Sequence, residues 1–381
     1  MKEIRIVAKV VSPILINEDR QSSNTISLDY IPGSTLRGAL AATYLRNGAA
    51  SDQVFRALFL GGSTIANLLP ASSADDDPEI LPMSVYSCKR HPGFLKNDIP
   101  QKDAAHGVQD MLALQAASRL SEKMAPSTQW ECSCRQELKP FGGFWNANLK
   151  SPRIFRTSKS YNRFTGIDRL TGTVAQSIFY TSQSLDDSQP GEFTDKPQYF
   201  SGRAKILDDS LEMLRELASD SVFVGADRTR GFGELELSIH EYKSSRPDYE
   251  GWNSAFKEKL GEQAGADFYF AISLESHAIL VDRFLRPAVD IDLCIADCQQ
   301  VMRITKGMYI RGWNVAWGLP KPDDTGLRAG SVFLYRYTGD NYEGLVEELE
   351  KIRHAGIGLR REEGFGMVQI DNMIHTTIGG L

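Results

Sequence analysis

Two glycine-rich segments carry arginines at matching positions, a combination suited to holding an anion. Residues 225–237 read GADRTRGFGELEL, and residues 358–370 read GLRREEGFGMVQI. Closely spaced glycines can adopt positive φ angles and turn backbone amides towards an anion, while basic side chains supply charge. A glycine-rich turn before an edge strand would explain either copy alone, but the matching register indicates a duplication. The candidate phosphate-binding residues here are Arg228, Arg230, Arg360 and Arg361.

A third segment, residues 153–182, interleaves positive charge with aromatic rings, and no acidic residue interrupts 153–166. Single-stranded nucleic acid requires charge that follows its backbone and rings on which unpaired bases stack. Two Thr-Gly turn signals and a β-prone tail predict a β-hairpin. The alternative is a hairpin with a solvated basic face. The candidate RNA-binding residues are Arg156, Lys159, Tyr161, Arg163 and Arg169.

A strong helix pattern begins within residues 31–45. Ser34 or Thr35 can cap this helix, whose free amides would attract phosphate, and Arg37 in the first turn could reach the same anion. A well-capped structural helix is the alternative, and these residues alone favour it.

Residues 308–322 combine two tryptophans, two prolines and two basic residues in one predicted loop. Arg311, Trp313 and Lys321 could supply charge and a stacking face to RNA. A core turn anchored by tryptophan explains the segment equally well.

Three cysteines and a histidine within residues 84–145 could hold zinc. Tetrahedral zinc accepts a set such as Cys88, His91, Cys132 and Cys134, although the second cysteine pair is one residue tighter than CxxC. His106 competes with His91 for the fourth position. Buried free cysteines are the alternative.

These residues are positioned by two halves with the same predicted order of elements. Apolar residues alternate over 4–10 and 268–274, and leucines at helical spacing precede the glycine segments, over 207–217 and 345–352. We predict an α+β fold of two tandem ferredoxin-like βαββαβ units with large insertions. The predicted domains are residues 1–243 and 266–381, and the linker 244–265 holds a short helix over 252–260.

The composition is that of a globular protein with 381 residues, 41% of them hydrophobic. A net charge of −6 argues against a free-standing, non-specific nucleic-acid binder but leaves room for a local basic groove. The acidic run at residues 75–77 is typical of a solvated loop. Neither a signal peptide nor a membrane span is evident, so no membrane partner is expected, and five cysteines suggest a reducing, cytoplasmic location.

Taken together, these segments resemble the RAMP proteins of CRISPR–Cas systems, which have tandem ferredoxin-like or RRM-like domains with a glycine-rich loop in each. The resemblance covers most of the chain. YIPGSTLRGAL (30–40) is similar to the first helix of type III effector subunits, and FTGIDRLTGTVAQSIFY (164–180) to a segment that commonly forms a β-hairpin thumb. GWNVAWGLPKPDDTGLRAGSVFLY (312–335) and the Cys-Lys-x-His-x-Gly-Phe segment at 88–94 resemble one branch, the group-five subunit of type III-D complexes.

The resemblance implies a non-catalytic subunit that grips the 5′ handle of crRNA and meets target RNA only indirectly. Such a subunit contacts the large polymerase-like subunit and the backbone RAMP subunits, and so caps the guide-bearing filament. Ser34 and Arg37 would hold phosphate, residues of 153–182 would form or flank the thumb, and the arginines of both glycine loops would face RNA.

Two other functions stay open. Some RAMP proteins are metal-independent endoribonucleases that process the guide precursor, and here His277, or less directly His354, would be the general base or acid. The chain could also be a zinc-bearing scaffold without direct RNA contact. P-loop, GxSxG and HExxH signatures are absent from the sequence.

Overall fold

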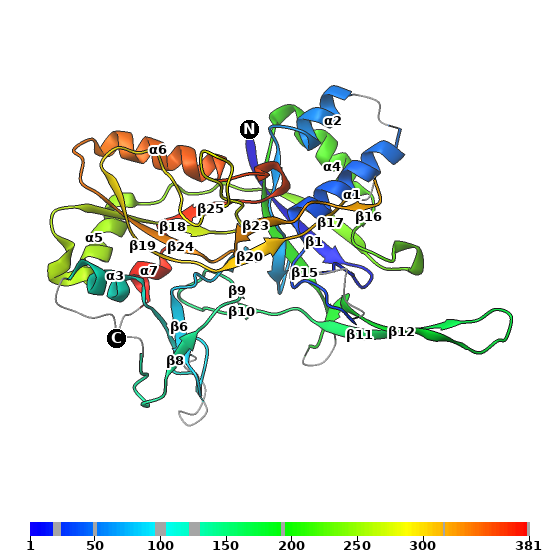
Figure 1. The fold of residues 1–381 in the computed structure, drawn as a ribbon. Helices are drawn as coiled ribbons and strands as arrows, with labels where there is room; N and C mark the ends of the chain where they lie inside the picture. The colour runs from blue at the N-terminus through cyan, green and yellow to red at the C-terminus, as the bar shows by residue number, and fades with distance from the viewer. Residues whose placement is uncertain are drawn as a thin grey trace.

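Two mixed α/β units lie side by side, and a long β-hairpin projects from the first (Figure 1). The computed structural model describes residues 1–17, 24–48, 52–95, 104–121, 130–191, 195–314 and 317–378. The helices are α1 (Gly33–Arg46), α2 (Asp52–Phe59), α3 (Leu112–Leu120), α4 (Leu211–Ser219), α5 (Tyr249–Leu260), α6 (Tyr342–Ala355) and α7 (Ile374–Thr377). Short 3-10 helices are η1 (Asp208–Ser210), η2 (Arg228–Arg230), η3 (Gly261–Ala264) and η4 (Arg361–Glu363).

The first large sheet has the strand order β16 (Val222–Phe223), β17 (Glu234–Glu241), β1 (Lys2–Val10), β15 (Tyr199–Ile206) and β3 (Thr64–Ile65), and β4 (Leu69–Ala71) also pairs with β15. The predicted alternation is confirmed, since Ile4, Ile6, Ala8 and Val10 are all buried. They pack against apolar residues of α1, α2 and α4 in one core. Burial of each large aliphatic side chain contributes about 1.5–3 kcal/mol to the free energy of unfolding. This core therefore holds β1 in place.

The second large sheet has the order β19 (Cys298–Ile304), β24 (Val332–Tyr337), β18 (Phe268–Leu274) and β25 (Val368–Ile370). Both of its faces are covered. Phe270 and Ile272 face the core that includes α6, whereas Tyr269 and Ala271 face a core shared with α3 and α5. The predicted linker 244–265 therefore contains a helix that packs on the second sheet, and α3, which the sequence assigned to the first domain, packs there as well.

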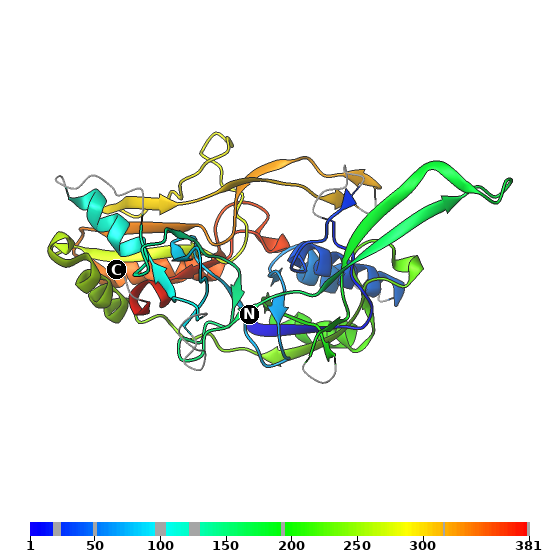
Figure 2. The same cartoon turned by 90° about the horizontal axis from the view of Figure 1, so that it is seen from below.

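Six smaller sheets complete the strands of the described residues. They are β10 (Ile154–Phe155) with β9 (Phe144–Trp145) and β5 (Glu79–Ile80); β7 (Val108–Asp110) with β6 (Val85–Cys88) and β8 (Leu138–Pro140); β11 (Lys159–Ile167) with β12 (Val174–Leu185) and β2 (Asn24–Thr25); β13 (Ser188–Gln189) with β14 (Lys196–Pro197); β20 (Gly307–Ile310) with β23 (Asp324–Leu327); and β21 (Trp313–Asn314) with β22 (Leu319–Pro320). The antiparallel pair β11–β12 is the projecting hairpin of Figures 1 and 2.

The two glycine segments share one backbone conformation, which supports the predicted duplication. Asp227 and Arg360 occupy equivalent left-handed positions with φ of 55° each, and each is followed by a 3-10 turn. The hydrogen bonds match too: the amide of Gly233 donates to Pro13, and that of Gly366 donates to His277, at 2.8 Å in both cases. We name residues 225–233 the first glycine loop and residues 358–366 the second.

The two units are joined by polar contacts centred on Arg203 of β15. Its guanidinium lies 2.9 Å from Asp77, 3.1 Å from Glu79 and 3.2 Å from Glu275 of the second unit. Burial alone would lower the pKa of Arg203, but these carboxylates raise it well above its usual value. The expectation of a merely solvated acidic loop was wrong for Asp77, because this carboxylate helps to hold a largely buried arginine.

Among the helices of the described ranges, none combines the length and apolar character needed to span a membrane.

Candidate functional site

The first glycine loop meets the projecting hairpin partway along its length through Arg230. Its guanidinium donates to the Tyr180 hydroxyl at 2.8 Å and lies 3.3 Å from Asp227. Tyr180 is the cross-strand partner of Phe164, and their rings stack with centroids 5.1 Å apart. Arg230 also lies 5.6 Å from the centre of the Phe164 ring. This contact fixes the hairpin relative to the loop. Phe164 is one of the aromatic residues interleaved with the basic ones in the sequence, but neither it nor Tyr180 was among the candidate RNA-binding residues.

Four exposed cations lie on or next to the hairpin and on the first glycine loop. Arg156, Arg163, Arg169 and Arg228 are all exposed. Within the described part of the chain, these four guanidinium groups make no hydrogen bond or ion pair. Each can therefore bind a phosphate without first giving up an internal carboxylate.

The hairpin has two different faces. Alternation along β11 exposes Tyr161, Arg163 and Ile167, whereas Phe164 belongs to the half-buried side that meets Arg230. Tyr161 is 69% exposed and Leu170 at the tip is 97% exposed. Lys159 differs from the other predicted residues of this segment, because its ammonium group donates to the Ser27 carbonyl and pairs with Asp29 at 2.8 Å.

Arg360 of the second glycine loop is held by carboxylates. It lies 2.7 Å from both Asp324 and Glu363, and Lys321 reaches Glu363 at 2.9 Å. Burial would raise the pKa of Glu363, but the hydrogen bonds from Arg360 and Lys321 lower it to about 2. Two of the predicted RNA-binding cations are thus neutralised within the chain.

Two further arginines near this loop bind backbone carbonyls. Arg361 donates to Ala355, the last residue of α6, at 3.3 Å. A cation at this end of a helix satisfies an unpaired carbonyl and favours the helix dipole. Arg37 of α1 donates to Phe59 at 3.1 Å and to Glu362 at 3.4 Å, which ties the first helix to the second loop.

The start of α1 differs from its predicted capping. Pro32 is the N-cap, and Ser34 and Thr35 lie inside the first turn, where neither side chain caps the helix. The amide of Gly33 donates to Asn67, and that of Thr35 donates to the Pro32 carbonyl. Some of the backbone amides at the start of α1 are therefore already hydrogen-bonded within the chain, and fewer of them are available to an anion.

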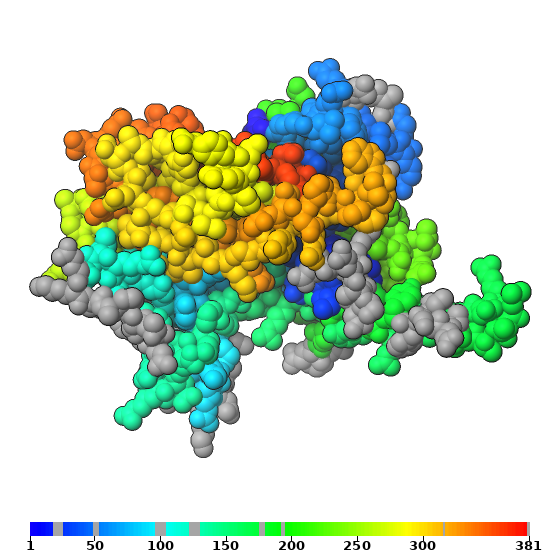
Figure 3. Space-filling view, in the orientation of Figure 1, coloured from blue at the N-terminus to red at the C-terminus, as the bar shows by residue number. Residues whose placement is uncertain are grey.

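The tryptophan-rich segment lies on an arm formed by β20–β23 and β21–β22. In Figures 2 and 3 this arm, coloured orange, extends from the second unit onto the first. Arg311 pairs with Asp323 at 3.3 Å, and Trp313 is 38% exposed. Trp317, which was not among the predicted site residues, is 78% exposed and offers the larger stacking surface.

Three cysteines and one histidine gather at one end of the sheet β7–β6–β8. The ligand atoms of Cys88, His106, Cys132 and Cys134 all lie within 4.8 Å of one another. The Cys88 and Cys134 sulfurs are 3.6 Å apart, and the Cys132 sulfur is 3.4 Å from Nδ1 of His106. A tetrahedron with Zn–S bonds of about 2.3 Å has sulfurs roughly 3.8 Å apart. The donor set and its spacing therefore fit zinc.

The histidine in this cluster is His106, so the prediction of His91 as the fourth ligand is corrected. His91 packs beside it with ring centroids 4.6 Å apart, and its carbonyl accepts the His106 amide. Burial would raise the pKa of Cys132, but hydrogen bonds from the Cys134 amide, the Ser133 hydroxyl and His106 lower it to about 6. A thiol that ionises this readily is suited to metal binding.

His277 is engaged through both ring nitrogens. Its Nδ1 accepts the Ala329 amide at 2.9 Å, so its Nε2 carries the proton and faces the Tyr30 hydroxyl at 3.1 Å. Burial, assisted by nearby Arg328, lowers its pKa to about 4. The ring joins the two units as a neutral hydrogen-bonding group, which is poorly placed for a general base.

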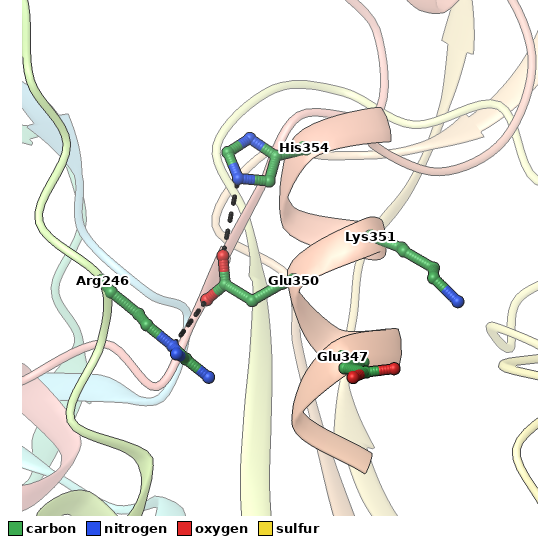
Figure 4. A pocket seen from close by; sticks show the side chains of 5 residues that line it. All are labelled: Arg246, Glu347, Glu350, Lys351 and His354. Atoms are coloured by element: carbon green, nitrogen blue, oxygen red, sulfur yellow. Dashed lines mark ion pairs between the residues drawn. The ribbon is translucent and has the colours of Figure 1, made fainter. Parts of the chain in front are cut away.

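His354, the other histidine considered for catalysis, lines a shallow hollow of about 490 Å³ with Arg246, Glu347, Glu350 and Lys351 (Figure 4). Its Nε2 lies 3.5 Å from Glu350, which also faces Arg246 at 3.8 Å. The hollow lies on α6, away from the first glycine loop, and its mixed charges provide no basic track for RNA.

Comparison with known proteins identifies a family. Residues 7–236 match the RAMP superfamily. No curated protein matches the chain. Among solved structures, a chain of Type III-B Cmr-beta bound to cognate target RNA and AMPPnP is 14% identical, with a TM-score of 0.45 over 91% of this chain and 93% of that one. Oligomeric Cmr4 from Pyrococcus furiosus is 11% identical, with a TM-score of 0.26 over 63% of this chain and 99% of that one.

Proposed function

The chain belongs to the RAMP superfamily, and on that premise we propose that it is a non-catalytic subunit of a type III CRISPR effector complex that binds the 5′ handle of crRNA. In this role it would cap the guide-bearing filament, next to the large polymerase-like subunit and the backbone RAMP subunits. The segments at 30–40 and 164–180 support this by their resemblance to type III effector subunits, and those at 312–335 and 88–94 by their resemblance to the group-five branch.

The observation that carries the proposal is a set of exposed cations on or next to the hairpin and on the first glycine loop, which have no partner among the described residues. Arg156, Arg163, Arg169 and Arg228 are exposed, and Tyr161 offers a ring on the same exposed face of β11 as Arg163. Guanidinium groups bind phosphates, and exposed rings stack on unpaired bases. A local basic surface on a chain with net charge −6 suits a protein that binds RNA at one place within an assembly.

The proposal takes the two units as tandem ferredoxin-like domains with the hairpin as a thumb. The first runs β1, α1, β3, β15, α4 and β17, and so alternates as strand, helix, strand, strand, helix, strand. The second follows the same order through β18, β19, β24, α6 and β25, with a loop in place of the first helix. The domain boundary is proposed near residue 244.

We also propose that Cys88, His106, Cys132 and Cys134 hold a structural Zn²⁺. Such an ion would staple the hairpin at residues 130–138 to the end of β6, because Cys132 and Cys134 come from that hairpin and Cys88 from the strand. The sheet it closes leads directly into α3, which packs on the second unit. The metal would thereby stabilise an insertion between the units.

The decisive experiment crosslinks RNA to this subunit in the complex purified from its own cells and sequences the crosslinked positions. Crosslinks concentrated on a constant 5′ tag are expected. Crosslinks spread along the variable guide would place the subunit in the body of the filament, and the absence of RNA would refute the proposal. His277→Ala provides the parallel test of the nuclease alternative, because intact processing of the precursor would remove that histidine's catalytic assignment.

A further inference from the structure

The apices of the two glycine loops have the same conformation but different surroundings. Gly231 and Gly364 have φ of 86° and 89° and ψ of 19° and 11°. A Cβ atom added at Gly231 would meet nothing within 4 Å, whereas one at Gly364 would lie 2.5 Å from the Ile65 carbonyl oxygen. The apex of the first loop is open, and that of the second is seated on β3 of the other unit.

The cations divide in the same way. At equivalent positions of the duplication, Arg228 is exposed without an internal partner among the described residues, whereas Arg361 donates to the end of α6. Arg360 is bound by two carboxylates, and Arg37 reaches across from α1 to the Glu362 carbonyl.

We infer that the two loops have divided two tasks between them. The first glycine loop, together with the thumb, contacts single-stranded RNA, and the second is an intramolecular clamp that fixes the two units to each other. The RNA half of this inference rests on the proposed function, while the clamp half rests on the contacts alone.

Electrostatics separate the two loops further. The first loop carries two arginines and one aspartate, whereas the second carries two arginines and two glutamates. Asp324 and Glu363 lie at hydrogen-bonding distance from Arg360, so a phosphate approaching this arginine would meet two carboxylates. At Arg228 the nearest acidic residue in sequence, Asp227, already pairs with Arg230.

The test compares the equivalent variants Arg228→Ala and Arg361→Ala in the full-length protein. The affinity for a fluorescent 20-nucleotide oligouridine is measured by anisotropy from about 50 to 200 mM salt, a range over which phosphate contacts weaken markedly. Loss of one phosphate contact lowers the slope of log K against log salt by about 0.7 for a single strand. We expect this change for Arg228→Ala and an unchanged slope for Arg361→Ala.

Thermal melting tests the clamp at the point where the second loop meets the first unit. Gly364→Ala forces a methyl group against the Ile65 carbonyl and is expected to melt below Gly231→Ala, whose added methyl group meets nothing within 4 Å. An equal loss of slope in Arg228→Ala and Arg361→Ala would overturn the division of tasks and leave the proposed function standing. Failure of the wild-type protein to bind the oligonucleotide at low salt would refute the proposed function and the RNA half together. Equal melting of Gly364→Ala and Gly231→Ala would refute the clamp.

Discussion

A pair of glycine substitutions isolates the contact between the second loop and the first unit. Gly231→Ala and Gly364→Ala place the same methyl group on nearly the same backbone conformation. The left-handed backbone costs alanine about 1–2 kcal/mol at either position, so this term cancels in the comparison. The remaining difference measures what surrounds each Cβ atom.

The extra destabilisation of Gly364→Ala follows from the distance to Ile65. The added Cβ would lie 2.5 Å from the carbonyl oxygen, whereas carbon–oxygen contacts are ordinarily about 3.3–3.6 Å. The loop or β3 must therefore move by roughly 1 Å, and forced rearrangements of this kind cost about 1–3 kcal/mol. With a shift of about 2–4 °C per kcal/mol, Gly364→Ala should melt roughly 2–12 °C below Gly231→Ala.

Differential scanning calorimetry of the two variants and the wild type provides the measurement, and urea unfolding followed by tryptophan fluorescence checks the order of stability. Gly231→Ala serves as the control for backbone strain. Equal melting temperatures in the two variants would refute the reasoning, since they would mean that Gly364 is no more tightly seated than Gly231. A larger loss in Gly231→Ala would contradict the open surroundings of the first loop.

Three further outcomes are expected. The purified protein should contain about one zinc per chain by mass spectrometry, and His106→Ala should lose the metal while His91→Ala keeps it; retention in both would refute the ligand set. Arg203→Met should lower the melting temperature strongly, because removing one partner of a buried ionic cluster costs about 3–5 kcal/mol, and a change within error would show that the cluster adds no stability. His277 has a pKa of about 4 in the folded protein, below its ordinary 6.5, so unfolding takes up a proton between these two pH values. The contribution of His277 to the free energy of unfolding is therefore fully present above about pH 6.5 and falls as the pH drops towards 4, and His277→Gln should abolish this pH dependence.

The repeated sequence pattern predicted the central strands and the two glycine loops, because these features depend on local periodicity. Alternation over 4–10 and 268–274 identified the central strands of both sheets. The shared glycine spacing identified two loops whose backbones and hydrogen bonds match. Each of these signals resides within a dozen neighbouring residues, so no knowledge of the tertiary fold was needed.

The partners of the arginines were beyond such reasoning. Arg360 finds Asp324, which lies 36 residues away, and Arg37 finds the Glu362 carbonyl, which lies 325 residues away. From the sequence, both glycine loops are basic segments that could bind RNA equally well. Only the fold shows which of their arginines already have a partner within the chain. The choice between His91 and His106 also depends on tertiary structure. Both histidines lie near the cysteines, and only the path of the chain in the fold determines that the His106 ring faces the thiols.

The negative net charge becomes intelligible once the carboxylates are located. Asp77, Glu79 and Glu275 surround Arg203, and Asp324 and Glu363 hold Arg360, so acidic residues gather where the two units meet. A cation used to join two units must be neutralised there, because a largely buried charge is tolerated only when it is paired. The projecting hairpin and the first glycine loop lie outside this cluster and keep arginines without internal partners among the described residues. The same total charge of −6 can therefore accompany a local basic surface. Paired arginines mark the part of the chain that holds the molecule together, and the exposed arginines mark the part to which we assign RNA binding.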